Sequence, residues 1–331
     1  MNKSAFTAAA LPLAARVAAF EARAAAPRAR AAAREAIIAT VGALMCGSGS
    51  ESARRLAENA GTRAANGPCL VAGTTRRTAM PDAALANGAA ASAGGQETGD
   101  GSGEGHATRF AALFALAEAR KLSGQRFHAA WLAGEAAAHS FERAAPTVAP
   151  GLSAILATVA AASHLLHLDA AATAAALVLG ASTTNETDLE AAAHGDALAT
   201  PLRAGQRART ALQAVMLAEQ GETGAAAHLT PDDTLIEALA QAAATFGDIP
   251  DATPPAHLSC DAFVARCSGA IGASEALALY ERLEAIDEAS DIALLGTLMA
   301  RRALPGAAGA SAPLALSTTP GDGSDETAWV P

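Results

Sequence analysis

Acidic, hydroxylic and imidazole side chains gather in one glycine-rich segment, residues 94–108. Carboxylates and histidine can exchange protons with a substrate, and histidine does so near neutral pH. We therefore predict that Glu97, Asp100 and His106 are catalytic and that Thr98 binds substrate. The glycines would let the backbone approach a ligand or move. A surface linker has the same composition, so that alternative stays open.

A second polar group consists of Thr200, Arg203 and Arg207. A guanidinium can hold a carboxylate through two parallel hydrogen bonds, and a hydroxyl can add another. We predict that these three residues bind a small-molecule substrate by its carboxylate or carbonyl group. Solvated charges at the start of a helix are the alternative interpretation.

The sequence offers only incomplete metal-binding patterns. Residues 100–105 resemble the first half of a calcium loop, but Ala111 stands where the closing glutamate belongs. His164 and His167 fall one helical turn apart, without a third ligand at a confirming spacing. The four cysteines form no paired motif, which favours reduced structural thiols. We expect neither a metal nor a cofactor.

The composition predicts a helical, globular protein. Hydrophobic residues make up 51% of the 331 residues and are mainly alanine, whereas aromatic residues make up only 3%. Small side chains suit closely packed helices, and strands prefer β-branched and aromatic residues. The net charge is -10 and no basic cluster appears, so we expect no nucleic-acid or membrane partner. No stretch of about 18 or more residues is both free of charge and consistently hydrophobic enough to span a bilayer, since the best candidate, residues 152–168, is interrupted by Ser and His, and we expect a cytoplasmic protein.

Apolar residues at helical spacing, broken by glycine and proline, predict an all-α fold. A short β-like run at residues 68–72 is too isolated to found a sheet. We expect one helical domain over residues 1–303 and a disordered tail over residues 304–331, which are rich in Pro, Gly, Ser and Thr. The predicted helices cover residues 8–34, 34–44, 51–59, 81–93, 108–121, 125–142, 152–168, 170–179, 201–220 and 260–302.

Several stretches, in order along the chain, resemble the MmgE/PrpD family. They include PDAALANGAA at residues 81–90, AEA at 117–119, LLHLD at 165–169, LRAGQ at 202–206 and LAEQGETG at 217–224. That family includes 2-methylcitrate dehydratases, cis-aconitate decarboxylase and an iminodisuccinate epimerase. The resemblance implies a large all-α domain, usually in a homodimer, and residues 261–299 look like its closing helices.

The chain also departs from the family. Family members carry an α+β lid before the closing helices, and here only residues 225–258 stand there, so the lid is expected to be deleted. The Asp-rich family motif falls on residues 95–99, and a His-Pro motif falls near residues 104–106. A further His-Pro becomes Ala149-Pro150. The family's lysine becomes Thr200, and Arg203 stands in the position of a family histidine.

Two classes of function fit these observations. The first is a divergent lyase, such as a dehydratase or decarboxylase, or an isomerase or cyclase, with a place in biosynthesis. It would remove a proton beside a carboxylate or carbonyl, which needs a base and a cation or donor for the developing enolate. The second is a non-catalytic relative that binds a small molecule or a protein partner. Activity after removal of His106 discriminates between the two classes.

Overall fold

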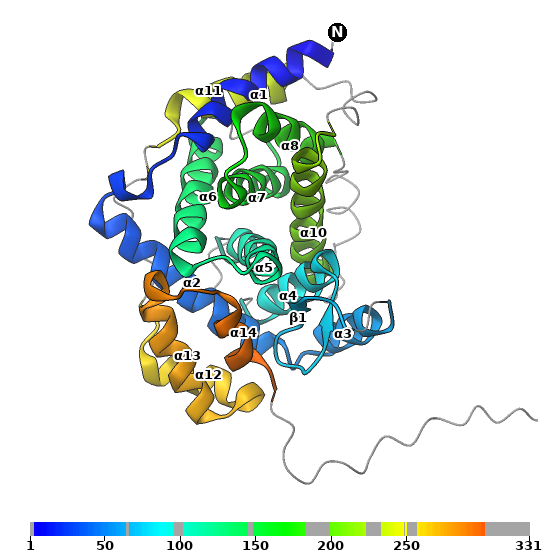
Figure 1. Ribbon diagram of the computed structural model, residues 1–331, viewed down its shortest axis with the longest axis vertical. Coiled ribbons are helices and arrows are strands. Elements are labelled where there is room, and N and C mark those ends of the chain that lie inside the picture. The colour runs from blue at the N-terminus through cyan, green and yellow to red at the C-terminus, as the bar shows by residue number, and fades with distance from the viewer. Residues whose placement is uncertain are drawn as a thin grey trace, which may run out of the picture.

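The computed structural model describes residues 3–63, 66–95, 102–144, 148–182, 199–222, 233–247, 249 and 257–301. Within these ranges the chain is mostly helical, as the all-α prediction requires (Figure 1). The elements are α1 (Lys3–Ala18), η1 (Ala22–Ala24), α2 (Pro27–Gly47), α3 (Glu51–Arg63), β1 (Cys69–Leu70), β2 (Arg77–Thr78), α4 (Met80–Gly95), α5 (Ser102–Arg120), α6 (Gly124–Ala144), α7 (Pro150–Leu166), α8 (Ala170–Ser182), α10 (Ala199–Glu219), α11 (Asp233–Thr245), α12 (Cys260–Ile271), α13 (Ala273–Glu284), η3 (Ile286–Glu288) and α14 (Ala293–Met299). None of the described helices is long and apolar enough to cross a membrane.

Helix α5 is the centre of the fold. It packs against α4, α6, α7 and α10, and Figure 1 shows α5 and α7 between α6 and α10. Every residue from 107 to 118 is buried, so this helix is enclosed on all sides. Three of those residues are Thr108, Arg109 and Glu118, whose polar groups need partners inside the protein. The residues that contact these three side chains therefore form the polar contacts of the core.

Two glycines bring α10 against α4. A Cβ atom on Gly205 would lie 2.2 Å from the carbonyl oxygen of Leu85, and one on Gly88 would lie 2.8 Å from the Cα of Gly205. Only glycine fits at this helix crossing, because a larger residue would push the backbones apart. The crossing fixes the start of α10, and with it Arg203 and Arg207, beside the central helix.

The β-like run at residues 68–72 does find a partner strand. Cys69 pairs with Thr78 and Leu70 with Arg77, in an antiparallel two-stranded sheet. Asn87 of α4 donates to the carbonyl oxygen of Leu70 and accepts from the amide of Ala72, both at 2.9 Å. The run was expected to be too isolated to found a sheet; it pairs with one two-residue strand, and the described residues contain no larger sheet.

The last described helices join the same core. Helices α12 and α13 pack on α2, and α14 packs on α5 (Figure 1). The amide of Gly124 donates to the carbonyl oxygen of Ala289, and that of Ile292 to Leu122, both at 2.8 Å. Residues 260–302 were expected to be helical, and they form α12, α13, η3 and α14, with Gly272 at a φ of 92° between the first two. Residues 257–301 thus belong to the helical body.

The predicted loop over residues 94–108 is largely wrong. Helix α4 continues to Gly95 and α5 begins at Ser102. A Cβ atom on Gly94 would lie 2.0 Å from the carbonyl oxygen of Ala43, so this glycine permits close helix packing rather than motion. Residues 96–101, including the predicted Glu97, Thr98 and Asp100, lie outside the described residues, as do the expected tail and, within residues 225–258, the stretches 225–232, 248 and 250–256.

Candidate functional site

The first two turns of α5 send polar side chains in two directions. Residues two positions apart on a helix point to nearly opposite sides, whereas residues three or four apart share a side. Glu104 and Thr108 accordingly meet α10, and His106 and Arg109 meet α6. The candidate site therefore has two halves, which we call the α6 side and the α10 side.

The α6 side centres on Glu135. His106 Nε2 lies 3.1 Å from Glu135 Oε1, and Arg109 Nη1 donates a hydrogen bond to the same oxygen. The side chains of His106 and Glu135 are 21% and 18% exposed, and that of Arg109 is 3% exposed. Solvent therefore reaches the histidine and the carboxylate, while the arginine stays inside.

Electrostatics keep Glu135 ionised. Burial by itself raises the pKa of its carboxyl group, but the positive charge of Arg109 and the contact with His106 outweigh it, and the pKa lies well below its ordinary value. A carboxylate at this position makes a neutral His106 donate its Nε2 hydrogen. His106 Nδ1 then carries the basic lone pair, which is the arrangement of a general base oriented by a carboxylate.

Trp131 and Gly134 hold this arrangement in place. The guanidinium carbon of Arg109 lies 5.2 Å from the centre of the Trp131 ring, and the His106 ring centre lies 5.4 Å from it. A Cβ atom on Gly134 would come within 2.7 Å of Arg109 Cδ and Nε, so glycine leaves the space that Arg109 fills. Arg109, Trp131 and Glu135 were not predicted as site residues from the sequence. The signal for Arg109 was a charge within an otherwise apolar helix, which requires a buried partner.

The α10 side brings together the two predicted arginines and one glutamate. Glu104 Oε1 lies 2.9 Å from Arg207 Nη1 and 3.5 Å from Arg203 Nε. The side chain of Arg207 is 5% exposed and that of Glu104 is 27% exposed. Thr200 is half-buried in the first turn of α10, three residues before Arg203. The α10 side thus contains cations next to one carboxylate.

In sequence, both sides also adjoin segments that the structure does not describe. Residues 96–101 precede α5 and residues 183–198 precede α10, and nothing is described for either. Ala149, at the position of a family histidine, is the N-cap of α7, and Pro150 is its first helical residue. Of the seven predicted site residues, the structure thus places His106, Thr200, Arg203 and Arg207.

The expected histidine pair has another role. His164 is buried with Nδ1 3.1 Å from the carbonyl oxygen of Val17, and burial lowers its pKa. His167 ends α7 in the left-handed conformation with a φ of 55°. Within the described ranges, no group of three or more His, Cys, Asp or Glu side chains could hold a metal.

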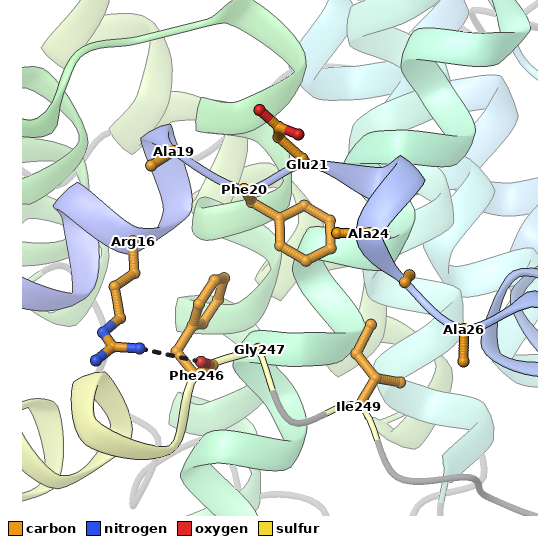
Figure 2. A pocket seen from close by; sticks show the side chains of 10 residues that line it. Arg16, Ala19, Phe20, Glu21, Ala24, Ala26, Phe246, Gly247 and Ile249 are labelled. Carbon is orange, nitrogen blue, oxygen red and sulfur yellow. Dashed lines mark hydrogen bonds between the residues drawn. The ribbon is translucent and has the colours of Figure 1, made fainter.

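A separate cavity of about 480 Å³ lies between the end of α1 and the end of α11 (Figure 2). Phe20, Phe246 and Ile249 supply its apolar wall, and Arg16 reaches the carbonyl oxygen of Phe246 at 3.4 Å. None of its lining residues belongs to the α6 side or the α10 side. In contrast to the α6 side, this cavity is not lined by a histidine paired with a carboxylate.

The helical core, with paired charges at the start of its central helix, defines an all-α domain. The chain matches the MmgE/PrpD N-terminal domain over residues 12–245, which is more than half of its length. The protein belongs to the MmgE/PrpD family. At the level of the family, this membership indicates a dehydratase- or lyase-like activity. No curated protein matches the chain.

Proposed function

We propose that this protein is a lyase, isomerase or cyclase that removes a proton beside a carboxylate or carbonyl group. The observation that carries the proposal is the contact of His106 with the ionised Glu135 at 3.1 Å on a partly exposed face. Family membership supports the same class of reaction. A small carboxylate or carbonyl compound is the proposed substrate.

The roles of the residues follow from their charges. His106 Nδ1 takes the proton from the substrate carbon, and the electron pair of the broken C–H bond moves into the adjacent carbonyl group to form an enolate. Glu135 stabilises the imidazolium that results. Arg203 and Arg207 lie across α5 from His106, so they hold the carboxylate of a substrate that reaches over the first turns of this helix, and a cation near an enolate oxygen lowers the energy of the intermediate. Thr200 adds a hydrogen bond from the first turn of α10. Glu97, Thr98 and Asp100 remain predictions as further site residues, and so does a homodimer.

The alternative is a non-catalytic binding protein of the same fold. One observation favours it: Arg109, Arg203 and Arg207 each contact a carboxylate of the protein itself. Such a site can be stable without any substrate. It would bind a ligand and release it unchanged.

Proton exchange tests the proposal without a known product. The protein is incubated in D2O with a panel of small hydroxy- and keto-carboxylic acids, and ¹H NMR follows the loss of each C–H signal. We expect exchange on at least one compound, and we expect H106N to slow it by about 100-fold or more. H257N is the control, because His257 is an exposed histidine that pairs with Glu35 away from α5.

The outcomes separate the two classes. Exchange that H106N abolishes and H257N retains supports the enzyme. Binding of a compound without exchange supports the binding protein. Equal exchange by the wild type and H106N would show that His106 is not the base.

A further inference from the structure

The carboxylate of Glu104 lies where a ligand carboxylate would bind. One of its oxygens, Oε1, contacts Arg207 Nη1 at 2.9 Å and Arg203 Nε at 3.5 Å. The two arginines stand one turn apart on α10, so their guanidinium groups reach the same side. Glu104 comes from the other helix and supplies the anion.

This contact is poorer than the other arginine–glutamate contact of the site. Arg109 donates a hydrogen bond to Glu135. Glu104 Oε1 and Arg203 Nε are both buried and neither has a hydrogen bond, whereas in the Arg109–Glu135 contact only Arg109 Nε lacks one. Buried polar atoms without hydrogen bonds cost free energy. Glu104 therefore compensates the charge of the arginines without a hydrogen bond to Arg203 Nε.

The surroundings of Glu104 allow its side chain to turn away from Arg203 and Arg207. It lies in the first turn of α5 and its side chain is partly exposed. A Cβ atom on the neighbouring Gly105 would meet nothing within 4 Å, so the helix is not closely packed at the residue that follows Glu104. A rotation about its side-chain bonds would expose the arginines to a ligand.

We propose that Arg203 and Arg207 form an anion site that Glu104 fills with its own carboxylate until a ligand carboxylate displaces it. The inference rests on the proposed function for the class of ligand, but it requires binding only and no turnover. Glu104 is then an internal competitor, which lowers the apparent affinity by the fraction of molecules in which it occupies the site. The negative charge of the ligand, rather than its shape alone, then displaces Glu104 from the two arginines.

Malonate and acetate are suitable probes, because they are small carboxylates. Wild type and E104Q are titrated with each by calorimetry, and thermal unfolding is followed at constant ionic strength with chloride as the reference anion. We expect E104Q to bind malonate about tenfold more tightly than wild type does, as follows if Glu104 occupies the site in about nine molecules of ten. We also expect malonate to raise the unfolding temperature of E104Q more than chloride does.

E219Q is the matched control. Glu219 of α10 pairs with Arg120 of α5 at 2.6 Å, so it joins the same two helices through an exposed contact. We expect E219Q to bind malonate as wild type does. If E104Q fails to fold, E104D keeps the charge on a shorter side chain and should still bind malonate more tightly than wild type.

Two results would overturn the proposal. One is equal malonate affinity in wild type and E104Q, which would make the contact purely structural. The other is an equal gain in E219Q, which would mean nonspecific anion binding. A failed proton-exchange assay affects neither result, so the anion site and the proposed reaction can be judged separately.

Discussion

His128 presents both ring nitrogens to acceptors, and one of them is the carboxylate of Asp287. Nδ1 lies 2.8 Å from Asp287 Oδ1, and Nε2 lies 3.1 Å from the carbonyl oxygen of Arg30. A carbonyl oxygen and a carboxylate can only accept, so in each of these contacts any hydrogen bond must be donated by the ring nitrogen. Arg34 also contacts Asp287, at 3.3 Å. These contacts tie η3, and with it the last helices, to α2 and α6.

Asp287 makes the stability of this junction depend on pH. Its hydrogen bond to His128, with further help from Arg34, holds the pKa of its carboxyl group below the ordinary value of 3.8. A depressed pKa contributes stability above the ordinary value, and this stability is lost as the pH falls through the folded-state pKa.

We therefore expect D287N to lower the free energy of unfolding at pH 7 by about 1 kcal/mol, a modest loss because Asp287 is 44% exposed. The difference from wild type should shrink as the pH falls below 4. Urea unfolding between pH 7 and pH 3 measures it. A difference that stays constant over this range would contradict the prediction.

Gly134 should resist substitution. In G134A the new Cβ would lie 2.7 Å from Arg109 and 2.9 Å from the Cβ of Ala161. We expect a loss of about 1–3 kcal/mol of stability, because the packed core cannot absorb the added atom. The control is G269A in α12, where a Cβ meets nothing within 4 Å, and there alanine should stabilise the helix by up to about 1 kcal/mol. Similar effects of the two changes on urea unfolding would refute the packing argument.

Asn87 should be required for the small sheet. In N87A the amide of Ala72 and the carbonyl oxygen of Leu70 lose their side-chain partner. We expect a loss of about 2–4 kcal/mol, because two buried backbone groups are affected. S140A is a matched control, since the buried Ser140 bonds only to the carbonyl oxygen of Ala136 in its own helix, and it should cost less than about 1 kcal/mol. Equal losses in urea unfolding would refute the role of Asn87.

The helices were predictable because their signal is local. Residues 125–142, 152–168 and 201–220 were expected as helices and are present as α6, α7 and α10, and the helix expected over residues 170–179 is α8, which Asp169 caps by accepting from the amide of Ala172. A glycine in the sequence, in contrast, can indicate either a loop or a close contact between helices. Gly94 was expected in a loop, but the reason for a glycine there is Ala43, which is distant in sequence.

The candidate site was predictable only in part. The types and spacing of Arg203 and Arg207 indicated an anion-binding pair, and the structure brings both to Glu104. The partner of His106 could not be predicted, because Glu135 is 29 residues away and meets it only once α5 and α6 pack together. Tertiary contacts of this kind leave no periodic pattern in the sequence.

The pairing of Arg109 with Glu135 allows structure and chemistry to be separated. E135Q leaves the buried Arg109 without a carboxylate, and we expect a loss of about 3 kcal/mol. Replacement of both charges in R109M/E135M removes the need for a partner, so the double variant should recover most of that stability. Proton exchange should nevertheless fall by about 100-fold or more in both variants, because each leaves His106 without its orienting carboxylate. Urea unfolding and exchange in D2O measure the two effects independently. A double variant with normal exchange would show that Glu135 only stabilises the fold, whereas one less stable than E135Q would show that Arg109 has a further structural role.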